Sequence, residues 1–562
     1  MKKAIQLLSN LSTEKFHLPL LGMFIGFSVY FSCFGYKFLN PFFIDWIMYG
    51  DPAQHFIGWH FFRSEPWGIP LGKIQSYLFP DGTSIVYTDS IPLMAILLKP
   101  FSSVLPDVFQ YQGIWVLLSY TLQGLFASLL LGKVSKAPLP ILLGTFFFSL
   151  SPIMWLRTEG HESLTSHWVI LASLYLYLSQ DTIRTRIMWR ILLLLTSMIH
   201  FYLLVMILII WGGYLLRELL KNFKYNVVPM IWTFTTTLFL LITVMWFAGY
   251  FVIDASSSVA SGYGDCSMNL IAPFNPPLST FFMKKISLSS GCQSFEGFNY
   301  FGFGLLLMIL ASLYVVFFQK NVFDLTRDLP LLIVTLTFLI LALSNKVMIA
   351  NKVIFYFELP DLLSNLLNVV RSSGRFFWPV AYILTVASIA ILVKYNRIKT
   401  AVIYILIALI FQFVELWPIY KKYSLIRHTL VRKSPWSYPL KSSLWDKLAS
   451  EYDHLILIPP FTDNDDYLPF ALLAASHGKT INVGHVAHQS LNKTKMKMEE
   501  LLQKLKEGYI SKDSLYVFLE KELFHKPSSS ADALIGILDG YLIMVPGFKT
   551  SSKDVQPWPC SL

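Results

Sequence analysis

The chain has 562 residues, of which 54% are hydrophobic and only 14% charged, and its formal net charge is +11 at pH 7. Soluble domains carry roughly 25% charged residues, so the composition excludes an ordinary soluble enzyme and indicates a membrane protein that crosses the bilayer several times. The basic residues fall mainly in short gaps between apolar runs. The positive-inside rule explains that placement without a nucleic-acid partner.

Apolar runs of about 15–20 residues or more are candidate membrane spans. The sequence predicts eleven of them, near residues 17–39, 111–132, 138–156, 163–180, 188–201, 202–216, 228–251, 300–319, 329–344, 376–393 and 400–418. The 188–216 stretch is basic at both ends, so we expect two short helices with a turn near His200. Lysines near the start predict a cytoplasmic N-terminus, and eleven spans then place the C-terminus outside.

The unusual polar residues gather in the loops that this topology places outside the cell membrane. We expect a transmembrane catalytic domain over residues 1–425, with a first outer loop at 40–110 and a further outer loop at 252–299. The tail, residues 426–562, is predicted to form a small extracytoplasmic α/β domain. The tail lacks the glycine-rich fingerprint that binds phosphate, so a nucleotide-binding role is not expected. We favour a docking or acceptor-recruiting role instead.

Strands and helices alternate in the tail. A buried strand with its exit turn is predicted at 453–460, further strands at 479–483 and 541–545, and helices at 467–475 and 493–507.

Asp51 stands where the first outer loop begins, in a segment that is expected to form a helix on the membrane surface. A carboxylate at the water–lipid boundary suits a general base that deprotonates an acceptor as it attacks a sugar carbon. The alternative is an N-cap, because Asp followed by Pro is a helix-start signal. Further along the same loop, Asp89 follows Tyr87 and precedes another apolar surface helix. It is either a second carboxylate for metal or acceptor, or a cap.

A dense ionisable cluster, Arg157 to Glu162, joins the third and fourth predicted spans. Ionisable groups at a membrane edge usually have a partner or a ligand. Arg157 and His161 could bind the phosphate of a lipid-linked donor. Alternatively, Glu159 or Glu162 could pair with Arg157.

Arg371 and Arg375 lie four residues apart at the start of the tenth span, and so on one helical face if the helix starts early. Two arginines near serines and a glycine suit an anion site, and headgroup anchoring is the alternative. In the loop 252–299, Glu296 is the notable acid. Cys266 and Cys292 share that loop and could pair in an oxidising compartment, or stay as buried thiols.

The layout resembles the GT-C superfamily of integral-membrane glycosyltransferases, which includes aminoarabinose transferases, protein mannosyltransferases and oligosaccharyltransferases. More closely, Gly50–His60, Tyr87–Pro92, Glu296–Tyr300 and Arg371–Phe376 look like an uncharacterised bacterial family of this type. The resemblance covers residues from about 20 to 420. It implies a multi-pass protein of the bacterial cytoplasmic membrane, with a periplasmic C-terminal domain, that takes a sugar from a polyprenyl-phosphate carrier.

By that resemblance Asp51 matches the catalytic acid of the first loop. It lacks the adjacent second carboxylate seen in some relatives, which speaks against a requirement for a divalent metal; no other cofactor is indicated. The expected partners are a polyprenyl-phosphate sugar donor, an envelope glycan or lipid acceptor, and membrane lipids. Donor-phosphate binding is predicted for Arg157, His161, Arg371 and Arg375. Acceptor binding or support of the site is predicted for His55, Tyr87, Asp89, Glu159, His200, Glu296 and Tyr300.

A transporter or flippase of lipid-linked envelope precursors is the alternative function. Transporters tend to place polar groups near the bilayer midplane, often in inverted repeats. The sequence shows no such repeat, and its polar residues cluster at one predicted face.

Overall fold

The computed structural model folds into two compact units. The helical unit comprises Met1–Asn40, Tyr111–Ile242 and Ser261–Val431, and the loop–tail unit comprises Pro41–Gln110, Thr243–Ala260 and Arg432–Leu562. The structure describes residues 17–158, 160–253, 262–319, 322, 325–432, 436, 438–460, 465–487, 491–524, 533–548 and 554–558. The domain division at residue 425 remains a prediction from the sequence.

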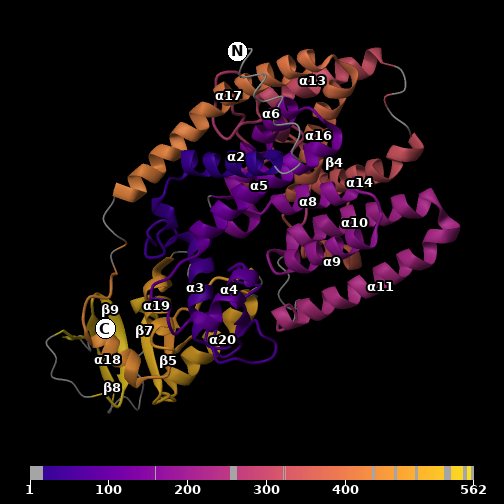
Figure 1. The fold of residues 1–562 in the computed structure, drawn as a ribbon. Helices are drawn as coiled ribbons and strands as arrows, with labels where there is room; N and C mark the ends of the chain where they lie inside the picture. The colour runs from indigo at the N-terminus through magenta and orange to yellow at the C-terminus, as the bar shows by residue number, and fades with distance from the viewer. Residues whose placement is uncertain are drawn as a thin grey trace. The chain divides into compact units, whose positions relative to one another are not determined.

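The helical unit contains most of the helices, with residues 243–248 at the end of α11 counted in the loop–tail unit (Figure 1). They are α2 His17–Cys33, α5 Gln112–Val134, α6 Pro138–Ser149, α7 Pro152–Arg157, α8 Trp168–Tyr177, α9 Ile183–Ser197, α10 Phe201–Lys221, α11 Phe223–Ala248, α12 Gly291–Phe295, α13 Phe303–Phe318, α14 Leu325–Leu343, α15 Asp361–Asn368, α16 Phe377–Tyr395 and α17 Ile398–Arg432. Shorter elements are η2 Lys37–Leu39, η4 Glu162–Thr165, η6 Ala272–Phe274, η7 Ser373–Phe376 and the antiparallel hairpin of β3 Lys346–Ile349 and β4 Lys352–Tyr356.

Each of the eleven predicted runs coincides with at least one helix. Among the described residues, six helices are long and apolar enough to cross a membrane: Gln112–Val134, Pro138–Arg157, Phe201–Lys221, Phe223–Ala248, Ser373–Tyr395 and Ile398–Ser424. Three shorter apolar helices are His17–Cys33, Pro92–Phe101 and Phe303–Phe318. The chain is therefore a membrane protein, whereas the number of eleven spans is not confirmed.

The predicted turn near His200 is present. Helix α9 ends at Ser197 and α10 begins at Phe201, with His200 as the N-cap residue. The His200 Nδ1 accepts a hydrogen bond from the Tyr202 backbone N–H at 3.1 Å, which satisfies one of the free donors at a helix start. The capping histidine therefore separates two helices that the hydropathy alone would have merged.

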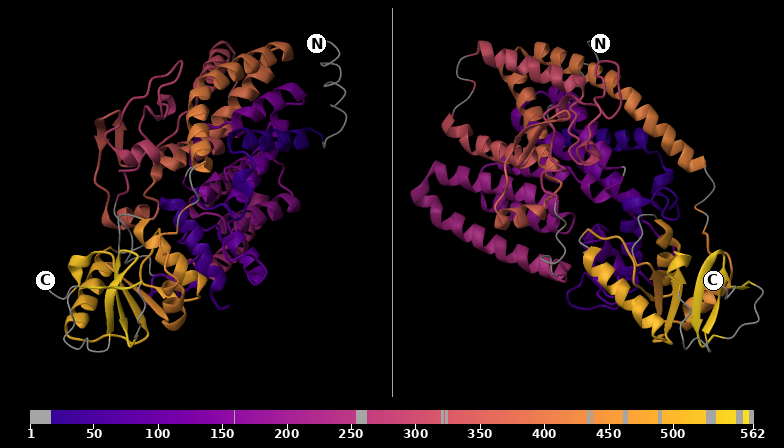
Figure 2. Two further views of the ribbon diagram at one scale, coloured as in Figure 1. Left: turned by 90° about the vertical axis from the view of Figure 1, so that its left-hand side faces the viewer. Right: turned by 180° about the vertical axis from the view of Figure 1, so that it is seen from behind.

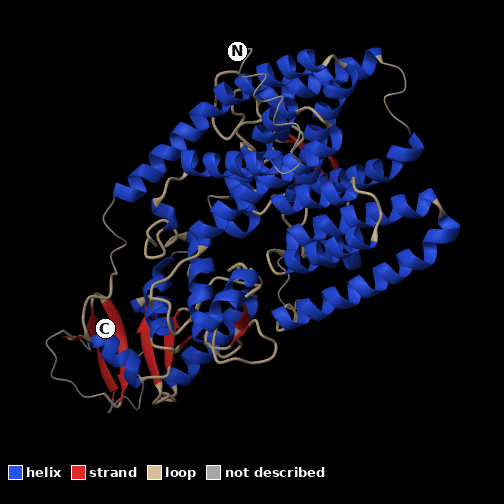
Figure 3. Ribbon diagram, viewed as in Figure 1, coloured by secondary structure: helices blue, strands red, loops and turns tan. Residues whose placement is uncertain are grey.

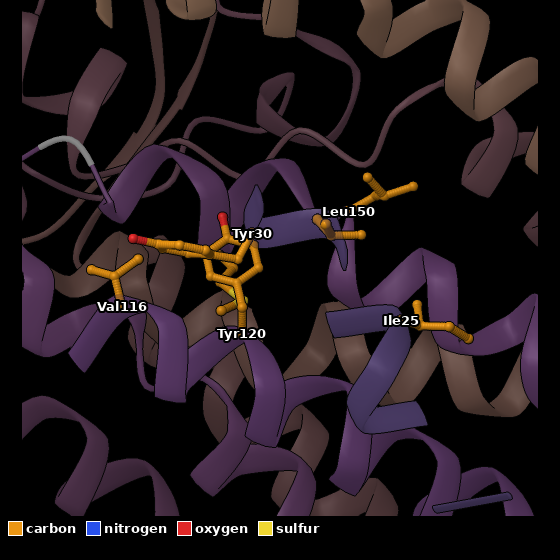
Figure 4. Packing of buried hydrophobic residues seen from close by; sticks show 7 residues of the cluster. Ile25, Tyr30, Val116, Tyr120 and Leu150 are labelled. Atoms are coloured by element: carbon orange, nitrogen blue, oxygen red, sulfur yellow. The ribbon is translucent and has the colours of Figure 1, made fainter. Parts of the chain in front are cut away.

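Helices α2 and α5 pack with their backbones in close contact, through small residues. A Cβ atom at Gly26 would lie 2.0 Å from the Tyr120 carbonyl oxygen, and one at Gly124 would lie 2.0 Å from the Gly22 carbonyl oxygen. Gly22 and Gly26 form a GxxxG pattern, which allows this approach between membrane helices. Next to it, Figure 4 shows Tyr30 and Tyr120 in a buried apolar cluster, with ring centroids 6.3 Å apart.

The loop–tail unit contains a six-stranded sheet (Figure 3). The strand order is β10-β8-β9-β7-β5-β6, in which β5 runs parallel to both β6 and β7, and the other pairs are antiparallel. The strands are β5 His454–Ile458, β6 Thr480–Ile481, β7 Ser514–Phe518, β8 Ala533–Leu538, β9 Tyr541–Pro546 and β10 Gln556–Pro557. The helices and short strands around it are α3 Gly50–Ser64, β1 Lys73–Ile74, β2 Thr83–Ser84, α4 Pro92–Leu98, η3 Lys99–Phe101, α18 Leu444–Glu451, η8 Asp465–Tyr467, α19 Leu468–Ser476, α20 Leu491–Lys506 and η9 Lys521–Leu523.

The tail is an α/β domain, as the sequence predicts. All three predicted strands appear, as β5, β6 and β9, and both predicted helices appear, as α19 and α20. Helix α20 packs on one face of the sheet through Leu505, against side chains of β5, β7 and β9 (Figure 2). The sequence reasoning missed α18, β7, β8 and β10.

The segment around Tyr77 extends the sheet beyond β6. Tyr77 forms a parallel bridge with Ile481, the Ile481 N–H donates to the Ser76 carbonyl at 2.9 Å, and the Phe79 N–H donates to the Ile481 carbonyl at 2.8 Å. Backbone hydrogen bonds therefore join the first loop to the tail, and both fold as parts of one unit.

Helix α3 is buried, and the expectation that it lies on the membrane surface is wrong. Every residue from Pro52 to Phe62 is buried. Large apolar residues occur all round the helix, whereas a surface helix needs one polar face. Helix α19 from the tail packs against it, and Ser64 Oγ donates to the Ala475 carbonyl at 3.4 Å.

Candidate functional site

Three cationic or titratable side chains converge on Glu296 in the helical unit. Arg375 contacts both carboxylate oxygens, with Nε–Oε2 at 2.6 Å and Nη2–Oε1 at 2.7 Å. Arg157 Nη1 lies 3.1 Å from Oε2, and His161 Nε2 lies 3.5 Å from Oε1. The cluster therefore brings together three of the four residues predicted to bind donor phosphate, and one residue predicted to support the site.

The two arginines are fixed by their surroundings as well as by Glu296. Arg157 ends helix α7, is fully buried, and donates through Nη2 to the Phe295 carbonyl at 2.6 Å. Its guanidinium lies 4.9 Å from the ring centroid of Phe295 and 5.4 Å from that of Trp378. Arg375, in η7, lies over the Tyr202 ring at 4.6 Å. Such cation–π contacts and a bidentate ion pair hold a guanidinium in one orientation.

The segment that carries Glu296 is tied to the segment that carries Arg375. Cys266 and Cys292 form a disulfide, with Cα atoms 4.9 Å apart, and the Gly374 N–H donates to the Cys266 carbonyl at 3.1 Å. Asn299 Nδ2 donates to the Gly374 carbonyl at 3.0 Å. A Cβ atom at Gly374 would lie 2.6 Å from the Cα of Gly297, so glycine is needed for this close contact.

Electrostatics keep Glu296 ionised despite its burial. Burial alone would raise the pKa of Glu296, but the charges of Arg375 and Arg157, with the hydrogen bond from His161, hold it well below its usual range. Two arginines and one carboxylate leave a net charge of +1, and more when His161 is protonated. The cluster can therefore attract an anion while its own buried charges remain paired.

Arg371 differs from Arg375, because the early helix start on which a shared helical face depends is not found. Arg371 precedes η7 and is exposed, whereas Arg375 lies inside η7 and is buried. The helix begins too late to place the two side chains on one face. Within the part of the chain that the structure describes, Arg371 forms no ion pair, so its guanidinium is open to a ligand.

The other predicted residues of the helical unit have separate roles. His200 caps α10, and the Tyr300 hydroxyl donates to the Glu415 carboxylate. Glu162 is fully buried, and Glu159 lies outside the described residues. Arg157 pairs with Glu296, which lies 139 positions away in the sequence. The sequence suggests the nearby acids Glu159 and Glu162 because it gives no sign of so distant a partner.

Sequence reasoning missed Glu415 and Tyr202. Glu415 is a fully buried acid in α17 and also accepts a hydrogen bond from the Phe282 N–H at 3.0 Å. A carboxylate within an apolar run is itself a signal, because such groups are rare in membrane segments. Tyr202 has no comparable signal, because its hydroxyl accepts from the Ser372 N–H at 2.8 Å across 170 positions.

A cavity of about 220 Å³ borders the Glu296 segment in the helical unit. Phe295, Phe298 and Leu156 form part of its apolar wall, and Lys285 and Gln293 contribute polar groups. Its volume is below the roughly 300–1,000 Å³ of typical ligand pockets.

In the loop–tail unit, Asp51 lies in the first turn of α3 and is exposed. The capping alternative is wrong, because the N-cap residue is Tyr49, whose side chain makes no capping hydrogen bond. Instead the Gly50 N–H donates to Asp465 Oδ2 at 2.9 Å. The sequence reasoning missed Asp465, which stands in an acidic run just before α19.

The remaining first-loop candidates also belong to the loop–tail unit. His55 is 1% exposed, and its carbonyl accepts from Ser90 Oγ at 2.6 Å. The Tyr87 hydroxyl donates to the Tyr250 carbonyl at 2.5 Å, and burial raises the Tyr87 pKa. Asp89 is half-buried with a φ of 52°; it is not the N-cap of α4, a position that Ile91 holds.

Among the described residues, no group of three or more His, Cys, Asp or Glu side chains is arranged to hold a metal ion. The arrangement around Glu296 is cationic, which suits an anion rather than a metal.

A family model described as a domain of unknown function, DUF6311, matches residues 23–417, well over half of the chain. The chain belongs to the DUF6311 family. A second model, the DUF6311 C-terminal domain, matches residues 444–546 of this DUF6311 protein. No curated protein sequence matches it.

Solved structures with distant similarity to the DUF6311 protein are oligosaccharyltransferases of Archaeoglobus fulgidus. One is tethered to an acceptor peptide containing the NVT sequon (TM-score 0.42, 10% identity, 84% of this chain and 64% of that chain covered). Another, AglB, is in complex with an inhibitory peptide and a dolichol-phosphate (TM-score 0.41, 12% identity, 89% and 69% covered). The DUF6311 protein thus spans less than two thirds of the length of the first. These similarities are too distant to assign it a substrate.

Proposed function

We propose that this DUF6311 protein is a membrane glycosyltransferase. It transfers a sugar from a polyprenyl-phosphate donor to a glycan or lipid acceptor of the bacterial cell envelope, on the outer face of the cytoplasmic membrane. The observation that supports this proposal best is the cationic cluster of Arg157, Arg375 and His161 on Glu296, with the exposed Arg371 in the adjoining segment. The resemblance of the sequence to GT-C enzymes agrees with it.

In this mechanism Arg371 contacts the donor phosphate directly, because its guanidinium is exposed. Arg157 and Arg375 are paired with Glu296 and do not contact the phosphate. They act through their positive potential, because the ion pairs hold both guanidinium groups in place before the ligand binds. Glu296 is the counter-ion that makes their burial tolerable. His161 adds positive charge when it is protonated.

Asp51 is the proposed general base. It accepts the proton of an acceptor hydroxyl while the hydroxyl oxygen forms a bond to the anomeric carbon. The bond between that carbon and the phosphate oxygen breaks, and its electron pair stays with the polyprenyl phosphate. The phosphate gains negative charge as it leaves, so a cationic site stabilises this product and the transition state that leads to it.

The test uses purified protein in lipid nanodiscs, a panel of labelled polyprenyl-phosphate sugars, and envelope lipids and glycans as acceptors. Asp51→Asn keeps the size of the side chain and removes the base, so we expect transfer to fall by about 10²–10⁴-fold. Asp107→Asn, which changes another exposed carboxylate of the first loop, is the matched control and should retain full transfer.

Two results would contradict the proposal. Full transfer by Asp51→Asn would remove the base assignment. If the wild type transfers no sugar from any donor but moves labelled lipid-linked precursor across proteoliposome membranes, the protein is a transporter instead.

A further inference from the structure

The tail contributes a carboxylate to the helix that carries Asp51. Helix α3 begins at Gly50, which has a φ of 52°, and the cap position is held by Tyr49, whose side chain does not cap. The first N–H groups of a helix need acceptors from outside the helix. Asp465 Oδ2 accepts from the Gly50 N–H at 2.9 Å, across 415 positions of sequence.

Asp465 is well placed for this role, because η8 and α19 are fixed against the first loop. Tyr467, two residues on, is 2% exposed, and Tyr77 is fully buried. The Tyr77 hydroxyl accepts from the His485 N–H at 3.1 Å, and its ring stacks on Phe61 of α3, with centroids 4.8 Å apart. Asp465 is thus followed, two residues on, by a buried tyrosine, while its own carboxylate lies within hydrogen-bond distance of the start of α3.

Asp465 and Asp51 also act on a common neighbour. Burial, with smaller contributions from the charges of Asp465 and Asp51, raises the pKa of Tyr467 to about 12. Both carboxylates are therefore close enough to the same phenol to influence it. A negative charge at this end of α3 also interacts favourably with the helix dipole.

We propose that Asp465 is a positioning residue for Asp51: it caps α3 from the tail and fixes the first turn, from which Asp51 presents its carboxylate to the acceptor. The inference rests on the proposed role of Asp51 as the base. It assigns the tail a part in the catalytic site, in place of the docking or acceptor-recruiting role that the sequence favours.

The first measurement does not depend on activity. Hydrogen exchange is followed in the full-length protein over the peptide that covers residues 49–54. Asp465→Ala removes the cap, so we expect exchange there to become about five- to tenfold faster, which corresponds to the loss of one helix cap. Asp465→Asn keeps an acceptor and should stay near the wild-type rate. Asp466→Ala, which removes the neighbouring exposed carboxylate, is the matched control and should change nothing. An unchanged rate in Asp465→Ala overturns the inference.

The second measurement uses the transfer assay with labelled polyprenyl-phosphate sugar. We expect Asp465→Ala to lower kcat by about five- to tenfold with the KM for the donor unchanged, and Asp465→Asn to restore kcat. A merely structural role would lower the amount of folded protein. It would not lower kcat at an unchanged KM, and Asp465→Asn would not restore kcat. If Asp465→Ala keeps the wild-type kcat while Asp51→Asn is inactive, the inference fails and the proposed function stands. If Asp51→Asn is fully active, the proposed base is wrong, and with it the role of Asp465 in positioning that base.

Discussion

His60 illustrates how burial changes the charge of a single side chain. It lies in α3, 3% exposed, with its ring 4.4 Å from that of Phe56. Burial, followed by the charge of Arg63, lowers the pKa of His60 to about 3. In the unfolded chain the imidazole titrates near its ordinary pKa of about 6.5. Below that pH the unfolded state therefore binds a proton that the folded state does not bind.

The sign of the pH effect follows from that difference. Stability is full above the unfolded pKa and is lost as the pH falls below it, because protons favour the unfolded state. As the pH falls from 7 to 5, we expect the buried, neutral His60 to lower the free energy of unfolding by about 2 kcal/mol. His60→Leu should remove that part of the pH dependence in denaturant titrations at the two pH values. His477→Gln replaces a more exposed imidazole. This variant should keep the pH dependence of the wild type. An equal pH dependence in wild type and His60→Leu would contradict the prediction.

The residues of the charged cluster could be named from the sequence, but their pairing could not. Arg157, His161, Glu296 and Arg375 are each conspicuous, because an ionisable group at the edge of an apolar run needs a partner or ligand. Their contacts join positions 79 and 139 apart. No local spacing rule reaches that far, so the sequence indicates only a supporting role for Glu296 and suggests nearer acids as partners for Arg157.

At the scale of elements, periodicity and hydropathy located the long helices and three strands of the tail, but missed β7, β8 and β10. The 188–216 stretch was divided correctly because charge at both ends gave independent information. Strand β7, Ser514–Phe518, is fully buried and too short for its apolar run to be distinguished from a helix segment. The surface-helix reading of α3 failed because the burying partner, α19, lies some 400 residues away in the sequence.

The contact between α2 and α5 gives a prediction at this scale. Gly26→Leu would place a side chain where a Cβ atom already lies 2.0 Å from the Tyr120 carbonyl oxygen. The backbones must separate, so we expect a loss of about 2–4 kcal/mol, at the upper end of the cost of overpacking. Thermal unfolding in detergent measures it. Gly132→Leu changes a glycine of α5 with no neighbouring atom within 4 Å and should be nearly neutral; similar melting temperatures for the two variants would refute the argument.

At the scale of the whole molecule, the first loop and the tail form one compact unit although the sequence separates them. Tyr77 is a buried side chain of the first loop that contacts the tail. Gly484 lies so close to it that an added Cβ would be 2.3 Å from the Tyr77 ring. Hydropathy marks neither contact, because both involve short segments of ordinary composition.

Tyr77 therefore should matter more through its ring than through its hydroxyl. We expect Tyr77→Ala to lower the unfolding free energy by about 3–5 kcal/mol, as for other large aromatic truncations. Tyr77→Phe loses the acceptor for the His485 N–H and should cost about 1–3 kcal/mol. Denaturant unfolding followed by tryptophan fluorescence compares the two. Equal costs would show that the hydroxyl, not the packing, holds the first loop to the tail.

The extension of the sheet by the Tyr77 segment has a consequence for biosynthesis. The edge strand that this segment pairs with, β6, is made about 400 residues later. At ribosomal rates of about 5–20 residues per second, the first loop waits on the order of half a minute for its partner. During that interval the apolar surface of α3 has nothing from α19 to cover it. We therefore expect the nascent protein to need the membrane or a chaperone to shield α3, and a shortage of either to increase misfolding before the finished protein is affected.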